Sequence, residues 1–274
     1  MVLLYFVAVF AVIVPAVAGP LLAYGPARRF ARGRVAARVG AAVDALTGML
    51  GRPVTAVVVL LASSAVVLVV FWPLGLLAHA LEEAVDEPVL TWVGTRLNPG
   101  FGAFNQFYTA LGDRLPLKWV TVVGALIFAA LWHRRFWIPL LAIPAAFVVE
   151  QYVQTAVSGL VDRGHPPTGL GTYPSGGVAR IVMTFGALAM FAVLTWRLAR
   201  RWQVALGTVV LVLATYEGYS RIYVQKHWLT DVLFGLLFGP ALFLGYALAV
   251  GVLAGPRARQ TKAAPAARTL EPAL

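Results

Sequence analysis

A short polar stretch, residues 220–231, carries side chains suited to phosphoryl transfer in an otherwise apolar chain. It runs Ser220-Arg221-Ile-Tyr-Val-Gln-Lys-His227-Trp-Leu-Thr-Asp231. If the stretch is helical, His227 and Asp231 are i,i+4 neighbours on one face, and the carboxylate can fix the tautomer of the imidazole. The other ring nitrogen is then free to act as a nucleophile. Arg221 supplies a planar fork that matches phosphate geometry, so these residue types predict phosphoryl transfer through His227.

The segment Pro174-Ser175-Gly176-Gly177 stands directly before an apolar run that begins near residue 179. Successive backbone N–H groups at a helix start form an anion site, and glycine lets the backbone approach a phosphate closely. An ordinary turn with Ser175 as the helix cap is the alternative. Together with residues 220–231, the segment favours phosphate binding. Arg180 opposes the helix dipole, so we expect it either to reach the phosphate site or to extend toward lipid headgroups.

Residues 220–231 resemble the third signature motif of the type 2 phosphatidic acid phosphatase (PAP2) superfamily: Ser-Arg, five residues, His, three residues, Asp. The resemblance extends over roughly residues 54–254. It implies that His227 attacks phosphorus to form a phosphohistidine and that Asp231 orients the imidazole. The family reaction is independent of metal, so no metal ion and no cofactor are expected. The groups expected to hold the phosphoryl oxygens are Arg221, Ser220, Arg163, Ser175, Gly176 and Gly177, with Arg180 and His165 as further candidates.

The other two motifs depart from the family pattern. The second motif, Pro-Ser-Gly-His, is matched except that Gly177 stands at the histidine. The first motif, Lys, six residues, Arg-Pro, is matched with Ser158 at the lysine and His165 at the arginine. Many members carry an additional arginine where this chain has Arg163. We interpret His165 as a weak phosphate ligand, a substitute proton donor, or a loop histidine without a role.

The missing second-motif histidine bears on the substrate. In the family this histidine protonates the leaving group, and general acid help of that kind is worth about 10² to 10⁴-fold. Gly177 cannot donate a proton, and it is expected to leave an open space at this position. The loss matters least when the leaving group is itself a phosphate, so we expect a lipid diphosphate, a polyprenyl diphosphate above all, rather than phosphatidic acid. The alternative is a catalytically degenerate protein that binds a lipid phosphate or serves as a membrane assembly partner.

Composition indicates a protein that crosses the membrane several times. The 274 residues are 60% hydrophobic and 12% charged, with a mean hydropathy of +0.82, which is too apolar for a soluble domain of this length. The net charge is +11, but the basic residues lie in short clusters between apolar runs, which excludes nucleic acid as the expected partner. The expected partners are the lipid substrate and membrane lipids. Cysteine is absent, so thiol chemistry is excluded.

Apolar runs of about 20 residues predict an all-α polytopic membrane bundle. The resemblance implies a six-helix PAP2-like core plus an additional N-terminal helix. The predicted spans lie near residues 2–19, 54–78, 118–132, 136–157, 179–196, 203–219 and 229–254. The predicted regions are an N-terminal anchor (1–24), a basic cytoplasmic segment (25–53), the membrane domain (54–254) and a disordered cytoplasmic tail (255–274).

Charge patterning predicts the orientation of the spans. Most Lys and Arg residues fall inside if the N-terminus lies outside, as the positive-inside rule requires. This orientation places all three motifs on the outer face of the membrane, which we expect to be a bacterial plasma membrane. The basic segment 25–53 is then either a topology-setting loop or an amphipathic helix on anionic headgroups.

Two acidic residues lie within predicted spans and need partners there. Glu150 lies in the predicted span 136–157, and Glu217 lies one helical turn before Arg221. An ionisable side chain at membrane depth is costly unless it is paired. We therefore expect a structural hydrogen-bond network around these acids, or a Glu217–Arg221 pair that orients the guanidinium.

Overall fold

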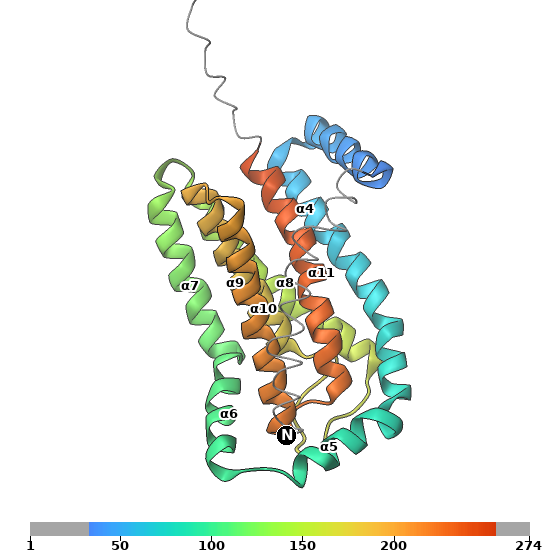
Figure 1. The fold of residues 1–274 in the computed structure, drawn as a ribbon. Coiled ribbons are helices and arrows are strands. Elements are labelled where there is room, and N and C mark those ends of the chain that lie inside the picture. Colours follow the sequence, from blue (N-terminus) through green and yellow to red (C-terminus); the bar gives the residue numbers. More distant parts are fainter. Residues whose placement is uncertain (1–32, 256–274) are drawn as a thin grey trace, which may run out of the picture.

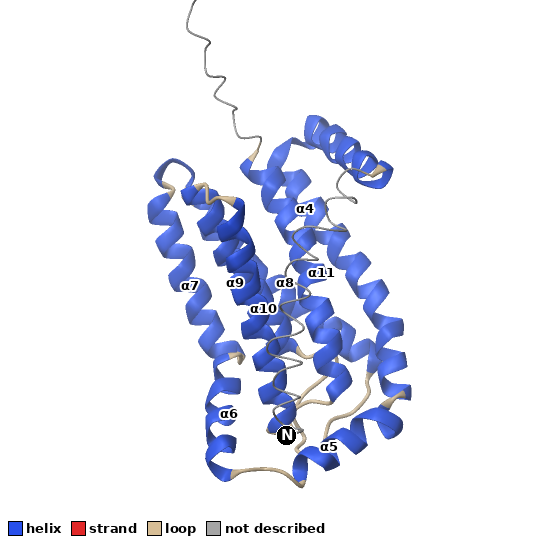
Figure 2. Cartoon of the chain, viewed as in Figure 1, coloured by secondary structure: helices blue, strands red, loops and turns tan. Residues whose placement is uncertain are grey.

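The computed structural model describes residues 33–255, and the chain is helical between connecting loops throughout this part (Figures 1 and 2). The predicted all-α membrane bundle is confirmed there. The predicted N-terminal anchor (1–24) and nearly all of the predicted tail (255–274) lie outside the described residues. In chain order the elements are α4 (Arg34–Ala80), the π-helical turn η2 (Glu82–Asp86), α5 (Glu87–Gly94), α6 (Pro99–Leu111), α7 (Arg114–Leu131), the 3₁₀ turn η3 (His133–Arg135), α8 (Trp137–Val161), α9 (Gly176–Trp196), α10 (Arg200–Tyr223) and α11 (Leu229–Ala254).

Within residues 33–255, five helices are long and apolar enough to cross a membrane: α4, α7, α8, α9 and α11. The protein is thus an integral membrane protein. The predicted span 203–219 lies in α10, which is 24 residues long but is not among the five. Its last turns carry Glu217, Ser220 and Arg221, which lower its apolarity. It nevertheless packs along α9 and α11 as a member of the bundle (Figure 1).

A kink divides α4 into a membrane-spanning part and a separate N-terminal part. Gly51 has φ 73° and ψ 163°, outside the helical region, and this positive φ is one that glycine adopts at little cost. Pro53 follows closely, and a proline disfavours the helical conformation of the residue before it. The N-terminal part, which ends at the kink, lies across one end of the bundle (Figure 1). The kink therefore falls close to the predicted boundary between the basic segment and the membrane domain.

The helix α9 lies at the centre of the bundle. Of its most apolar window 61% is buried, against 33% for each of the other four candidate spans. Glycines on α11 allow the two helices to approach closely, since a Cβ atom at Gly239 would lie 3.0 Å from the Ala179 Cα atom. Small residues at such contacts are typical of helix packing in membranes. This central position carries the N-terminus of α9, with Ser175, Gly176 and Gly177, into the interior of the protein.

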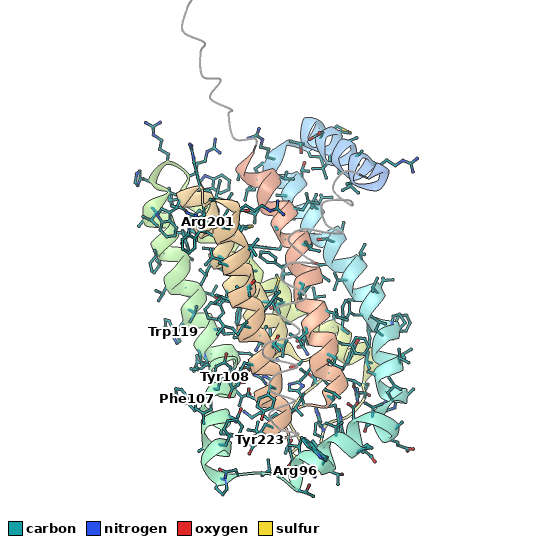
Figure 3. All side chains as sticks on the ribbon, viewed as in Figure 1. Arg96, Phe107, Tyr108, Trp119, Arg201 and Tyr223 are labelled. Atoms are coloured by element: carbon teal, nitrogen blue, oxygen red, sulfur yellow. The ribbon has the colours of Figure 1, made fainter. Side chains whose placement is uncertain are left out.

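The predicted inner and outer segments lie at opposite ends of the bundle. The basic turns around Arg134 and Arg201 and the start of α4 lie at one end, and α5, α6 and the loop 162–175 lie at the other (Figures 1 and 3). Between the ends, large apolar side chains face outward, as Trp119 on α7 illustrates (Figure 3). Such an apolar belt fits a surface surrounded by lipid.

Candidate active site

His227 lies in the turn between α10 and α11, so the condition that one helix carries both His227 and Asp231 is not met. The helix α10 ends at Tyr223 and α11 begins at Leu229. Asp231 belongs to the first turn of α11, where its Oδ2 atom accepts a hydrogen bond of 3.3 Å from the Trp228 backbone N–H. The turn still brings His227 Nδ1 to 3.4 Å from Asp231 Oδ2. The carboxylate therefore faces Nδ1, and Nε2 is the ring atom left for chemistry.

Burial favours the neutral form of this imidazole. His227 is only 4% exposed, and burial lowers its pKa from the ordinary value of 6.5. The hydrogen bond and charge of Asp231 oppose this shift, while the positive charges of Arg221 and Lys226 add to it. A neutral imidazole with one nitrogen directed at a carboxylate keeps a lone pair on the other nitrogen. His227 thus has the protonation state that a nucleophile needs near neutral pH.

Arg163 holds the far side of Asp231. Its Nη1 atom donates to Asp231 Oδ1 at 3.1 Å and to Thr230 Oγ1 at 2.7 Å. Its Nη2 atom donates to Asp86 Oδ2 at 2.6 Å, and its Nε atom faces a Glu82 carboxylate oxygen at 3.4 Å. The guanidinium is buried in this ring of carboxylates. In this arrangement Arg163 positions Asp231, which in turn faces His227.

Asp86 belongs to this site although the motifs did not point to it. It is 1% exposed and lies in η2. Its Oδ1 atom accepts the Thr230 backbone N–H at 2.9 Å, and its Oδ2 atom accepts the Thr230 hydroxyl at 2.6 Å. Asp86 thereby caps the start of α11 and neutralises Arg163 at once. The signal in the sequence that could have pointed to Asp86 was its spacing from Glu82, since the two acids are four residues apart beside a membrane span.

Arg221 occupies the space next to Gly177, so the open space expected there does not exist. A Cβ atom at Gly177 would overlap the Arg221 guanidinium. That guanidinium donates to Glu217 Oε1 at 2.7 Å, which confirms the expected Glu217–Arg221 pair. It also donates to Asp113 Oδ1 at 2.8 Å and to the Thr109 carbonyl at 3.3 Å. Glycine at position 177 is what lets this side chain lie against the start of α9.

Arg180 faces the interior of the bundle, which excludes the alternative that it extends toward headgroups. It is 4% exposed, and its Nε atom donates to Glu150 Oε2 at 2.9 Å. Its Nη1 atom donates to the Gly112 carbonyl at 3.2 Å. A Cβ atom at Gly176 would lie 3.1 Å from Arg180 Nη2. Arg180 and Arg221 therefore flank the two glycines that open α9, each with a carboxylate partner.

The two serines of the motifs are placed differently. Ser175 directly precedes α9, but its side chain makes no capping hydrogen bond. Its backbone N–H donates to the Asp231 carbonyl at 2.9 Å, so the starts of α9 and α11 meet beside His227. The Ser175 hydroxyl is buried and has no hydrogen-bond partner within residues 33–255, which leaves it available to a ligand. The Ser220 hydroxyl instead donates to the Glu217 carbonyl of its own helix at 2.8 Å.

His165 lies on the exposed loop that covers His227. Its Nδ1 atom is hydrogen-bonded to the Gly171 carbonyl. A Cβ atom at Gly171 would lie 3.0 Å from His227 Nδ1, so this backbone packs directly against the imidazole. His165 thus braces the covering loop, and Gly171 separates it from His227. The hydroxyl of Thr168 fastens the same loop to the Gln225 carbonyl at 2.6 Å.

A groove of about 440 Å³ adjoins the turn that carries His227. The first turns of α6 line one side of it, and Tyr223, Val224 and Gln225 line the other. His227 itself does not line the groove. The groove therefore reaches the residues just before the candidate nucleophile, while the imidazole stays covered by the loop 162–175.

Comparison with known proteins agrees with this geometry. Residues 144–253 match the family model described as the PAP2 superfamily. Among solved structures, the chain is similar to a transmembrane PAP2 type phosphatidylglycerolphosphate phosphatase from Bacillus subtilis, at 23% sequence identity and a TM-score of 0.54, over 65% of this chain and 92% of that chain. A search of curated proteins found no significant match. The resemblance predicted from the motifs is thus confirmed, and the bundle is PAP2-like in fold.

Proposed function

We propose that the protein is a membrane lipid phosphatase that works through a phosphohistidine at His227. The observation that carries this proposal is the buried His227–Asp231–Arg163 chain, in which a neutral imidazole is oriented through Nδ1 at the meeting point of two helix starts. An oriented imidazole whose second nitrogen is free is the arrangement that nucleophilic catalysis by histidine requires. The family match and the fold support the same class of reaction.

The reaction follows from the positions of these groups. The Nε2 atom of His227 attacks the terminal phosphorus, a P–N bond forms, and the P–O bond to the leaving group, a lipid monophosphate when the substrate is a diphosphate, breaks. Positive charge develops on the imidazole, and the Asp231 carboxylate beside Nδ1 stabilises it. A water molecule then attacks phosphorus, the P–N bond breaks, and inorganic phosphate leaves with the imidazole neutral again. The Ser175 hydroxyl and the start of α9 are positioned to donate to the phosphoryl oxygens.

The substrate proposal rests on the position of Gly177. The Arg221 guanidinium fills the place where a proton-donating side chain would project, so leaving-group protonation from this position is excluded. A guanidinium stays charged at neutral pH and is a poor acid. A diphosphate ester expels a phosphate that needs little protonation, whereas a monoester expels an alkoxide. We therefore propose a lipid diphosphate, with a polyprenyl diphosphate as the preferred substrate, acted on at the outer face of a bacterial plasma membrane.

A second candidate function, binding of a lipid phosphate without cleavage, is favoured by one specific observation. The three arginines near the motifs already have carboxylate partners: Asp86, Glu82 and Asp231 for Arg163, Glu150 for Arg180, and Glu217 and Asp113 for Arg221. A phosphate that uses these guanidiniums must compete with internal carboxylates. Such competition weakens the electrostatic stabilisation that these guanidiniums can give to the phosphoryl group in the transition state.

Phosphate release from a panel of lipids distinguishes the two functions. Purified protein is incubated with a polyprenyl diphosphate, the matching monophosphate, phosphatidic acid and phosphatidylglycerolphosphate. We expect release from the diphosphate above all, and its loss in His227→Ala. The control is His133→Ala, because His133 is exposed at the opposite end of the bundle and should leave the rate unchanged. Binding of the diphosphate without release of phosphate would support the second candidate function. Equal rates of phosphate release in wild type and His227→Ala would refute the phosphohistidine intermediate.

A further inference from the structure

The internal ion pairs leave the site short of free positive charge. Arg163, Arg180 and Arg221 are each buried, and each donates to at least one buried or half-buried carboxylate. The position of the first-motif lysine is held by Ser158, which carries no charge. A phosphoryl group brings about two negative charges to His227, and burying them without a cation is costly. A ligand of this kind calls for a cation that is not already neutralised.

Lys226, the residue directly before His227, meets this requirement. Its side chain is half-buried, and its ammonium group forms no hydrogen bond or ion pair in the part of the chain that the structure describes. The backbone at this residue is firmly placed, because its N–H donates to the Arg221 carbonyl at 2.9 Å. Its carbonyl packs against Gly171, whose missing Cβ atom makes room for it. The ammonium group is thus without an ion-pair partner on a stem that starts from a fixed backbone, and its charge also acts on Glu217 from a distance.

The charge of Lys226 acts at His227. Together with Arg221, it contributes to the lowering of the His227 pKa, next to the larger effect of burial. The turn that holds both residues follows Tyr223, which lies near the end of the bundle that carries α5 and α6 (Figure 3). The groove of about 440 Å³ reaches this turn through Tyr223, Val224 and Gln225. In the sequence, the lysine therefore stands between Gln225, which lines the groove, and His227.

We propose that Lys226 is the cation that binds the phosphoryl group of the substrate at His227. The proposal deepens the proposed function and rests on it in part, since it assigns the phosphate recognition of the same site. A lysine ammonium binds phosphate as a compact point charge with three donors and needs no fork geometry. Lys226 thereby supplies the charge that Ser158 does not, from a different element of the fold.

Two variants and a matched control test this role in the full-length protein in neutral detergent. Lys226→Met removes the charge and keeps an unbranched apolar stem, and Lys226→Arg keeps the charge. The control is Lys118→Met, because Lys118 is exposed on α7. The probes are inorganic pyrophosphate, with binding measured by calorimetry, and the polyprenyl diphosphate, with phosphate release measured. Removal of one charge-assisted hydrogen bond corresponds to a loss of about 10- to 100-fold.

We expect Lys226→Met to weaken pyrophosphate binding and to lower kcat/KM by that factor, Lys226→Arg to retain most of both, and Lys118→Met to change neither. The binding arm separates this proposal from the proposed function. If wild type binds pyrophosphate but releases no phosphate, a loss of binding in Lys226→Met still supports the lysine while the phosphatase proposal fails. Equal binding in wild type and Lys226→Met, or no binding in wild type, would overturn it. The same variants are also compared in vesicles. If Lys226→Met lowers activity only in vesicles of anionic lipid, the proposal is overturned, because attraction to the headgroups then explains the effect of the lysine.

Discussion

Replacing Asp86 by asparagine tests whether the tertiary contacts of η2 hold the active site together. The change keeps the shape of the side chain and removes its charge. In the native protein the Asp86 carboxylate pairs with Arg163 at 2.6 Å and caps α11 through the Thr230 N–H at 2.9 Å. An asparagine Oδ1 atom can still accept the Thr230 N–H. The variant therefore isolates the buried ion pair, with the cap largely preserved.

The size of the effect follows from burial. Both side chains are almost fully buried, at 1% and 0% exposure, so solvent screens the pair little. Breaking a buried pair by removing one partner costs about 3–5 kcal/mol. Glu82 and Asp231 still face Arg163, so we expect the lower end, about 3 kcal/mol. In chains of roughly this size each kcal/mol corresponds to about 2–4 °C, which gives a melting temperature lower by about 6–12 °C.

Thermal unfolding in detergent, followed by tryptophan fluorescence, measures this shift. Glu83→Gln is the matched control, because Glu83 lies on the same π-helical turn but is exposed. Asp86→Ala, which also removes the cap, should melt lower than Asp86→Asn by the equivalent of about 1 kcal/mol. If Asp86→Asn melts together with Glu83→Gln, the pair between Asp86 and Arg163 does not support the fold, and the positioning of Asp231 through Arg163 loses its basis.

Four further predictions concern the site and its orientation. Gly177→His should lower diphosphate hydrolysis by about 10- to 100-fold, because the new side chain displaces Arg221 from its partners; faster hydrolysis of a monophosphate would contradict the observed packing. Because burial lowers the pKa of His227 below 6.5, the acid limb of the kcat/KM profile should lie below pH 6.5, and a limb at or above that value would show a solvent-like imidazole. The unfolded chain binds this proton more readily than the folded one, so stability should also decline as pH falls below 6.5. Cysteines introduced at Leu170 and Ala37, which are exposed at opposite ends, should be labelled by an impermeant maleimide from outside and from inside respectively, and labelling from one side alone would refute the proposed orientation.

Local spacing was enough to predict some of the site. His227 and Asp231 are four residues apart, and both a helix and the observed turn bring them together. The pairing of Glu217 with Arg221 also followed from spacing, because residues four apart are neighbours on any helix. The membrane class and all five candidate spans within residues 33–255 followed from apolar runs, since the bilayer thickness fixes the length of a spanning helix. The polar end of α10 blurred this signal for the span 203–219.

Other features of the site depended on contacts between distant parts of the chain. Arg163 and Asp231, which are in contact, lie 68 residues apart in the sequence, and Asp86 and Thr230 lie 144 residues apart. The motif comparison suggested an open space at Gly177, yet Arg221 fills it because Asp113, 108 positions away, helps to hold the guanidinium there. None of these partners follows from periodicity, because helices that are apolar on all sides give no sign of which faces meet.

The sequence by itself determined a membrane helix bundle with a histidine and a carboxylate placed for phosphoryl transfer, because these depend on chain-local spacing and on the length of apolar runs. Only the tertiary structure decided which charges stay free. The fold brings each motif arginine to a carboxylate from another turn or helix, whereas the ammonium group of Lys226 forms no hydrogen bond or ion pair in residues 33–255. The cost of an unpaired charge in a poorly solvated interior is the physical reason why the buried arginines are paired, whereas Lys226 is only half-buried.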